Sequence, residues 1–367
     1  MINNKSIAVV VPSYNEEKQI GMVIESMPDF VDRIIIVNDC SSDRTSEVVL
    51  SYLNSQFNYT NEIINTKFTI KRTRFNNAEM VAQEQQEKEL SYFTESQVIN
   101  STEQDRIILI NHLKNGGVGA AIASGYNWAK DHNIDCTAVM AGDGQMDPDE
   151  LEDICLPVVN NNIDYVKGNR LIHRSALLVI PKIRFLGNSV LSILTKIASG
   201  YWHVSDTQTG YTAISKRGIN SIRLHEIYNS YGMPNDMLVK LNIAMCTLKE
   251  VEIKPIYNVG EQSKMKISKV IPTISLLLLR SFFKRLYFKY LFRDFHPLFL
   301  LYHLAFILTL FAAPLGIDLF FSMFIEGISF TDQKLLIFSF LLITAFQSLL
   351  FAMWMDIQDN ERLYKSE

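Results

Sequence analysis

The stretch VMAGDGQMDPDE, residues 139–150, passes from apolar residues directly into five acidic or amide side chains. Hard carboxylate oxygens at such a place suit Mg²⁺ or Mn²⁺, so a divalent cation is the first ligand to consider. Asp147 precedes Pro148, and this order favours a cap for the helix predicted to begin at Asp149. Asp143, with one glycine on each side, is the candidate ligand for such a cation.

The elements around this stretch predict how it is positioned. Four short apolar segments end in polar residues and alternate with helix-like stretches, which is typical of a mainly parallel sheet with helices on both faces. Ligands of such sheets bind beyond the carboxyl ends of the strands, so the polar ends should converge on one site. The four segments are SIAVVVPS, DRIIIVNDC, RIILINH and DCTAVMAGD, and their polar ends are PSYNEE, NDCSSDRT, NGGVGAA and GDGQMD.

Composition limits the class of protein. The 367 residues are 48% hydrophobic and 20% charged, which predicts a folded chain with more than one structural unit. A net charge of -4 argues against nucleic-acid binding through a bulk positive field. The four cysteines form neither a CxxC pair nor a cluster with histidines, which fits a reducing compartment.

Long apolar runs lie near the end of the chain. Residues 335–355 carry no charge and are long enough to cross a bilayer, and residues 297–325 form a second run interrupted by Pro314, Gly316 and Asp318. The two runs predict a transmembrane hairpin, against the alternative of a buried helical core. A basic segment precedes them and predicts an interfacial helix on the cytoplasmic side of the membrane; its charges are Arg280, Lys284, Arg285, Lys289 and Arg293.

These patterns divide the chain into a cytoplasmic domain, an amphipathic segment, two membrane helices and a cytoplasmic tail. The predicted boundaries are 1–258, 259–295, 296–355 and 356–367. An insert at about 54–105 is interpreted as a surface excursion with an exposed helix in its middle.

An ordered set of motifs gives a resemblance to a known family. The chain resembles the family 2 glycosyltransferases with the nucleotide-binding GT-A fold, and among them the polyprenyl-phosphate sugar synthases such as dolichyl-phosphate mannose synthase. The match covers about residues 6–255 apart from the insert. The motifs are VVVPSYNEE, IIIVNDCSSDRTSE, NGGVGAAIASGY, AGDGQMDP, VKGNR and DTQTGYTAIS.

The resemblance implies a nucleotide-diphosphate sugar as donor and Mg²⁺ or Mn²⁺ as cofactor. Asp143 corresponds to the second acid of the family's DxD motif, whereas Ala141 stands at the first, so metal binding rests on fewer protein ligands. Gln145 resembles a position near the sugar or diphosphate. The predicted nucleotide-binding residues are Pro12, Tyr14, Glu16, Asp39 and Gly119. Asp43 is interpreted equally as a ligand residue or as a helix N-terminal acid.

On the acceptor side, polyprenyl phosphate is already charged at neutral pH and needs cations more than a base. By resemblance, Arg170 contacts the phosphate, with Lys167 as a weaker candidate, while Lys264 and Lys266 lie where an anionic head group would enter. Plain attraction to anionic lipids explains these two lysines equally well. Further acceptor-side candidates are Asp206, Gln208, Gly210 and Tyr211.

Three functions follow from this reading. The first is an inverting, metal-dependent hexosyltransferase acting on polyprenyl phosphate at the cytoplasmic face of the membrane. The second is a transferase that elongates a lipid-linked or cell-surface glycan at a sugar hydroxyl, with Asp236 as general base, although Asp236 also fits a helix cap. The third is an inactive nucleotide-binding membrane scaffold, supported by Ala141 alone. The sugar, the nucleotide base (UDP or GDP) and the lipid stay open, and a homo-oligomer is compatible with the sequence.

Overall fold

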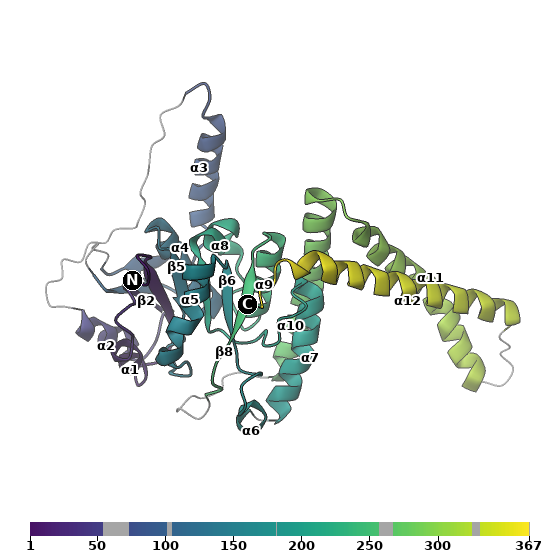
Figure 1. The fold of residues 1–367 in the computed structure, drawn as a ribbon, viewed down its shortest axis with the longest axis horizontal. Coiled ribbons are helices and arrows are strands. Elements are labelled where there is room, and N and C mark those ends of the chain that lie inside the picture. The colour runs from purple at the N-terminus through teal and green to yellow at the C-terminus, as the bar shows by residue number, and fades with distance from the viewer. Residues whose placement is uncertain (54–72, 101–104, 181, 257–266, 325–330, 367) are drawn as a thin grey trace.

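The computed structural model describes residues 1–53, 73–100, 105–180, 182–256, 267–324 and 331–366 (Figure 1). Its centre is an eight-stranded sheet in the order β3-β4-β2-β1-β5-β7-β6-β8. The strands are β1 Ile7–Ser13, β2 Arg33–Asn38, β3 Ser96–Val98, β4 Ile107–His112, β5 Cys136–Val139, β6 Tyr165–Asn169, β7 Thr212–Ser215 and β8 Leu248–Glu252. All but β3 and β7 run in the same direction. The predicted mainly parallel sheet is confirmed.

Helices cover both faces of the sheet because its central strands are apolar on both sides. In β1, Ala8 and Val10 join one core with helices α4, α8 and α9, while Val9 and its alternate neighbours join a second core with α1, α2 and α5. These helices are α1 Ile20–Glu25, α2 Thr45–Tyr52, α4 Val118–Asp131, α5 Leu151–Asn161, α8 Lys216–Ser221 and α9 Met233–Ile243.

The insert contributes one predicted and one unpredicted element. Helix α3, Asn77–Leu90, has no buried side chain among those described, and Figure 1 shows it standing away from the sheet. This agrees with the predicted exposed helix. Strand β3 pairs antiparallel with β4 and extends the sheet, so the interpretation of the insert as a surface excursion alone was incomplete. Three residues are too few for strand periodicity to be visible in a sequence.

Two long helices lie between the sheet and the C-terminal hairpin. Figure 1 shows α7, Lys182–Ser199, and α10, Ile267–Tyr287, side by side and crosswise to the hairpin. Large apolar side chains of both helices face outward, among them Val190, Ile193 and Leu279. Such an apolar outer face is typical of helices that lie in a membrane interface. A short helix, α6 Ala176–Val179, precedes α7, and a π-helical turn, η3 Phe288–Arg293, follows α10.

The hairpin consists of α11, Pro297–Phe324, and α12, Asp332–Glu361. The two helices are antiparallel, because Lys334 pairs with Asp318 at 3.3 Å near one end, while Leu298 and Ala352 share a core near the other. Both are long and apolar enough to cross a membrane, and only 11% and 17% of their most apolar windows are buried. A core helix of a soluble protein would be mostly buried. This exposure therefore supports the two predicted membrane helices over the alternative of a buried helical core.

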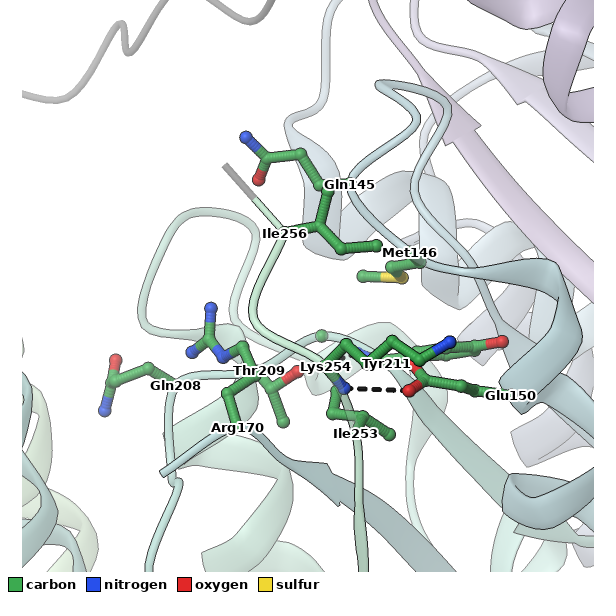
Figure 2. A pocket seen from close by; sticks show the side chains of 11 residues that line it. Gln145, Met146, Glu150, Arg170, Gln208, Thr209, Tyr211, Ile253, Lys254 and Ile256 are labelled. Carbon is green, nitrogen blue, oxygen red and sulfur yellow. Dashed lines mark hydrogen bonds between the residues drawn. The ribbon is translucent and has the colours of Figure 1, made fainter. Parts of the chain in front are cut away.

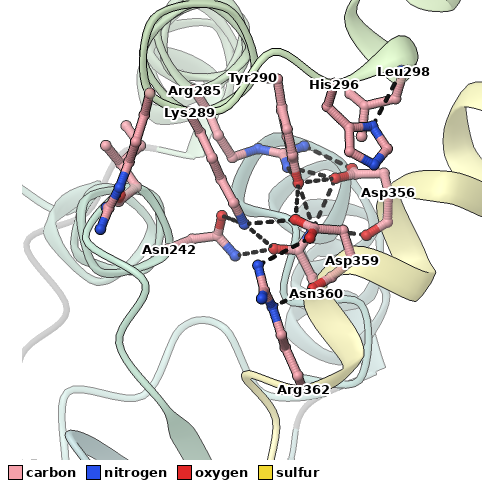
Figure 3. Close-up of polar contacts among 12 residues, drawn as sticks. Asn242, Arg285, Lys289, Tyr290, His296, Leu298, Asp356, Asp359, Asn360 and Arg362 are labelled. Carbon is pink, nitrogen blue, oxygen red and sulfur yellow. Dashed lines mark hydrogen bonds and ion pairs between the residues drawn. The ribbon is translucent and has the colours of Figure 1, made fainter.

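A buried polar cluster, here called the junction cluster, ties the hairpin to the sheet domain (Figure 3). Its members are Asn242, Arg285, Lys289, Tyr290, Asp356, Asp359 and Asn360. The Arg285 guanidinium donates to both carboxylate oxygens of Asp356, at 2.7 and 2.8 Å. Lys289 donates to Asn242 of α9 and to Asn360 of α12. The sequence predicted these two cations on the charged face of an interfacial helix, whereas both are fully buried.

Candidate active site

A pocket of about 180 Å³ opens at the carboxyl edge of the sheet (Figure 2). Its walls come from the segments that follow β5, β6 and β8 and from the segment that precedes the antiparallel β7, since all four meet at this edge. It is lined by Gln145, Met146, Glu150, Arg170, Gln208, Thr209, Gly210, Tyr211, Ile253, Lys254 and Ile256. The structure thus brings together Gln145 and Arg170, which the sequence placed in separate motifs. A small-molecule site usually measures about 300 to 1,000 Å³, so this pocket is smaller than a complete ligand site.

The acidic turn after β5 lies beside the end of β1. Asp143 accepts a hydrogen bond from the main-chain N–H of Gln145 at 3.1 Å, and Gly144 adopts a positive φ of 75° that closes the turn. A Cβ on Gly142 would lie 3.4 Å from the Pro12 carbonyl oxygen. The turn that carries Asp143 is therefore next to the predicted nucleotide-binding segment.

The described residues contain no group of three or more His, Cys, Asp or Glu side chains that could hold a metal ion. A complete protein cage for a cation is therefore absent from the part of the chain that the structure describes. The single carboxylate of Asp143 fits the other common mode, in which Mg²⁺ takes one or two protein carboxylates and fills its remaining positions with phosphate oxygens and water.

Asp147 is a helix cap, as the sequence favoured. Its side chain accepts from the Asp149 amide at 3.0 Å at the start of a 3₁₀ turn, η1 Pro148–Glu150. It also pairs with Lys254 at 2.8 Å, and this hydrogen bond holds the pKa of Asp147 below its ordinary value. Glu150 accepts from the Lys254 amide at 2.8 Å, and burial raises the pKa of its carboxyl against that bond.

Arg170 is held in the pocket by a buried carboxylate. Its Nε and Nη2 donate to the two oxygens of Asp206, at 2.8 and 3.1 Å. Burial acts to raise the pKa of Asp206, but the Arg170 guanidinium outweighs it and the pKa is lowered. Because the Arg170 side chain remains 23% exposed and lines the pocket, a fixed guanidinium is presented to whatever occupies it.

A buried cation supports the loop that carries Asp206. Lys167 of β6 is fully buried and donates to the Thr209 carbonyl oxygen. Burial lowers its pKa to about 8, although Asp206 and Glu250 oppose this change. Lys167 is inaccessible to a ligand, so the structure gives it a supporting position below the pocket.

The predicted nucleotide-binding residues lie at the tips of β1 and β2. Pro12 is in β1, while Tyr14 and Glu16 follow it in a loop that interlocks with the loop after β2. In that second loop Asp43 accepts from Thr45 and from the Glu17 amide. Of its two interpretations, Asp43 therefore fits the helix N-terminal acid. A role of Pro12, Tyr14 and Glu16 in nucleotide binding stays a prediction.

Asp39 organises the neighbouring turn. Its carboxylate accepts from the Gly116 and Gly117 amides, both at 2.8 Å, and contacts His112 Nδ1 at 2.7 Å. His112 in turn contacts Ser124 of α4 at 2.9 Å through Nε2. Burial acts to raise the pKa of Asp39, but these hydrogen bonds prevail and lower it. Asp39 thus shapes the glycine turn, and its predicted contact with the base or ribose stays a prediction.

The glycines of this turn are required by packing. A Cβ on Gly119 would lie 2.0 Å from the Tyr228 carbonyl oxygen, and one on Gly117, where φ is 88°, would lie 2.3 Å from that of Asn229. No other residue type fits so close to a backbone. This contact explains both glycines without a ligand, and nucleotide binding by Gly119 stays a prediction.

The structure does not bring Asp236 to the pocket wall. It lies in the first turn of α9, where its carboxylate accepts from the Tyr228 amide at 2.9 Å and pairs with Lys240. The residue that reaches toward the pocket is its neighbour Asn235, which accepts from Gln208 at 2.9 Å. These contacts favour the local structural interpretation of Asp236 over that of a general base.

Sequence reasoning missed Glu150 and Lys254 as pocket residues. Lys254 lies two residues after β8, so the rule applied to the first four strands would have found it at the last strand. Lys264 and Lys266 lie outside the described residues.

Comparison with known proteins confirms the family resemblance. Residues 8–77 match the family model described as glycosyl transferase family 2. The chain is 27% identical over 255 residues to a UDP-N-acetylglucosamine–dolichyl-phosphate N-acetylglucosaminyltransferase of Methanococcus voltae, covering 69% of this chain and 87% of that protein. It is 24% identical over 295 residues to a dolichyl-phosphate beta-glucosyltransferase of Trichomonas vaginalis, covering 76% of this chain and 74% of that protein.

Among solved structures, the chain is similar to glucosyl-3-phosphoglycerate synthase of Mycobacterium tuberculosis in complex with Mn²⁺, uridine diphosphate and phosphoglyceric acid. The TM-score is 0.46 at 14% identity, covering 77% of this chain and 78% of that one.

Proposed function

We propose that this protein transfers a hexose from a nucleotide-diphosphate sugar to polyprenyl phosphate, with inversion, at the cytoplasmic face of a membrane. The observation that carries the proposal is the connection between the pocket and helices α7 and α10, here called the membrane-side helices. Along the chain, Arg170 is followed by α6 and α7, and the pocket residue Ile256 precedes α10. Ser192 of α7 contacts Thr207, beside the pocket residue Gln208, at 3.1 Å. A lipid-borne phosphate approaching along these helices would meet the pocket first.

The ion pairs at the two ends of the hairpin support a membrane span. Lys334 pairs with Asp318 at one end, and Arg285 pairs with Asp356 at the other. On α12 the two paired positions are 22 residues apart, which is about 33 Å along a helix and matches a hydrocarbon core of about 30 Å. After α12, the chain returns to the sheet domain at β8, so the sheet domain and the segment after the hairpin share one side. The basic flank before the hairpin favours the cytoplasm for that side.

The acceptor needs little activation. A phosphate monoester has a second pKa near 6, so its oxygen is already a charged nucleophile at neutral pH. In the reaction this oxygen forms a bond to the anomeric carbon, the bond from that carbon to the diphosphate breaks, and the nucleoside diphosphate leaves. Arg170, fixed by Asp206, would hold the acceptor phosphate, and Gln145 would face the sugar or diphosphate across the pocket.

Asp143 would hold a Mg²⁺ or Mn²⁺ ion together with the donor's phosphate oxygens. When bound, that ion supplies neutralisation of the charge that grows on the leaving diphosphate. The chain's own task is to present one carboxylate at a fixed position, and the Gln145 amide and the positive φ of Gly144 serve that task.

The test is a transfer assay with purified protein in detergent, radiolabelled UDP- and GDP-sugars, Mg²⁺ or Mn²⁺, and polyprenyl phosphate. We expect label in a lipid product that mild acid cleaves, and a loss of about a hundredfold or more in Asp143→Asn. Asp149→Asn is the matched control, because Asp149 is an exposed acid of the same segment, and should stay active. Label that appears only in a lipid-linked glycan would contradict the proposal and favour the elongating transferase.

A further inference from the structure

The segment that follows α12, residues 362–366, docks on the edge strand of the sheet. The Leu248 amide donates to the Leu363 carbonyl oxygen at 2.7 Å, and the Lys365 amide donates to the Leu248 carbonyl oxygen at 2.8 Å. Tyr364 forms a parallel bridge with Leu248, and the Leu363 side chain is buried in the core shared with α4 and α9. The docked segment therefore covers part of the open edge of β8.

One side chain of the docked segment reaches a half-buried carboxylate of β8. The Tyr364 hydroxyl lies 3.5 Å from Glu250 Oε2, and the tyrosine ring packs against His203 with centroids 5.3 Å apart. Glu250 lies two residues after Leu248 in β8, on the same face of the strand. Its carboxylate also accepts from the Ser205 amide at 3.0 Å and from the Asp206 amide at 3.1 Å. The same carboxylate therefore touches the docked segment and the loop before β7.

That loop carries the acceptor side of the pocket. Its Asp206 accepts from the Arg170 amide and guanidinium and from the amides of Gln208 and Thr209. The next residues, through Tyr211, form one wall of the pocket. Glu250 is thus one contact away from the carboxylate that orients Arg170.

We propose that residues 362–366 are a positioning element of the pocket, acting through Tyr364 and Glu250 on the loop that orients Arg170. This element begins where α12 ends, and α12 is tied to α10 through Asp356 and to α9 through Asn360. The position of the membrane hairpin and the geometry of the acceptor site are therefore set together. The inference rests on the proposed function for its kinetic test and on the contacts alone for its structural test.

The kinetic test compares Tyr364→Ala, Tyr364→Phe and Glu250→Gln in the full-length chain, with donor and acceptor varied separately. We expect KM for polyprenyl phosphate to rise by about threefold to tenfold in Tyr364→Ala, which loses both the hydroxyl contact and the ring, and in Glu250→Gln, which loses the charge that accepts the loop amides. Tyr364→Phe loses only the hydroxyl contact and should raise KM less. KM for the donor should stay unchanged. Lys365→Ala is the matched control, since it removes an exposed side chain and leaves the backbone pairing intact.

The structural test is amide hydrogen exchange of the loop from Ser205 to Tyr211, which needs no substrate. We expect faster exchange of this loop in Tyr364→Ala and Glu250→Gln than in Lys365→Ala, at an unchanged Tm. Unchanged exchange and unchanged acceptor KM in both variants would overturn the inference, and so would an equal rise in donor and acceptor KM together with a lower Tm. A wild-type protein that makes no lipid product but shows the exchange difference would refute the proposed function and leave the positioning element standing.

Discussion

Two regions of this molecule are built around the same pair of groups, an arginine bidentate to an aspartate, and differ in how much of the arginine they cover. At the junction cluster both Arg285 and Asp356 are fully buried, and the remaining guanidinium donors reach main-chain oxygens of Ala198 and Ile197. In the pocket the Arg170 side chain keeps 23% of its surface exposed over a buried Asp206. The guanidinium donors of Arg285 bind oxygens of the protein, whereas Arg170 keeps part of its side chain exposed to the pocket.

Under the proposed function, this difference separates a structural from a functional use of one chemical motif. A buried ion pair whose donors are all used has no capacity left for a substrate, and its value is to fix how two segments meet. The hairpin helix α12 and helix α10 meet at such a pair. An arginine oriented by a buried acid but still partly exposed keeps its geometry while it binds, which is what phosphate recognition needs.

The largest effect, on the free energy of unfolding, is expected from breaking the buried Arg285–Asp356 pair. Arg285→Met would leave the Asp356 carboxylate buried without its cation, a change that typically costs about 3 to 5 kcal/mol in the free energy of unfolding. Thermal unfolding in detergent should show a Tm that falls by many degrees. The double variant Arg285→Met/Asp356→Leu should recover much of this loss, because neither charge is then left unpaired. If Arg285→Met were as stable as the wild type, the interpretation of the buried Arg285–Asp356 pair as a structural contact would be wrong.

A smaller effect, on activity instead of stability, is expected from a substitution in the partly exposed Arg170–Asp206 pair. Arg170→Lys keeps the positive charge beside Asp206 but loses the planar fork, so transfer should fall by about tenfold to a hundredfold while Tm changes little. Arg174→Lys, at an exposed position four residues later, is the matched control. Equal activities of these two variants in the transfer assay would remove Arg170 from the acceptor site.

The sequence predicted the pocket residues better than the junction cluster, for a physical reason. Gln145 follows a strand with a clear apolar run, and strand ends of a parallel sheet converge whatever the intervening chain does. Arg170 follows β6, whose sequence YVKGN has no such run, and it was found through the family resemblance. The partner of Arg285 lies 71 residues away on another helix. No local period signals such a pairing, and the segment around Arg285 is just as compatible with a charged interfacial face. The contact of Asp39 with His112 was hidden in the same way, since it depends on which strands become neighbours.

The smallest effect is expected at a third contact between a cation and a carboxylate, which lies on the surface. Lys284 of α10 pairs with Glu226 at 2.9 Å, with side chains 46% and 31% exposed, and Arg223 pairs with the same carboxylate. Glu226 ends a 3₁₀ turn, η2 Leu224–Glu226, so this pair also joins the sheet domain to the membrane-side helices. An exposed pair of this kind contributes less than about 1 kcal/mol and weakens with salt. Lys284→Met should therefore lower Tm only slightly at pH 7.

The pH dependence of that small difference is the sharpest check on the comparison. Burial acts to raise the pKa of Glu226, but hydrogen bonds from Lys284 and Arg223 prevail and lower it from 4.5 to about 2. Since the folded pKa lies below the unfolded one, the stabilisation is complete above about pH 4.5 and is lost as the pH falls toward 2. The Tm difference between wild type and Lys284→Met should thus be constant from pH 7 to 5 and shrink below that, and 0.5 M salt should reduce it at pH 7. The Arg285→Met difference should persist at the same salt concentration, because salt ions do not reach a buried pair. If salt reduced both differences equally, burial would not be what distinguishes the junction cluster from the surface.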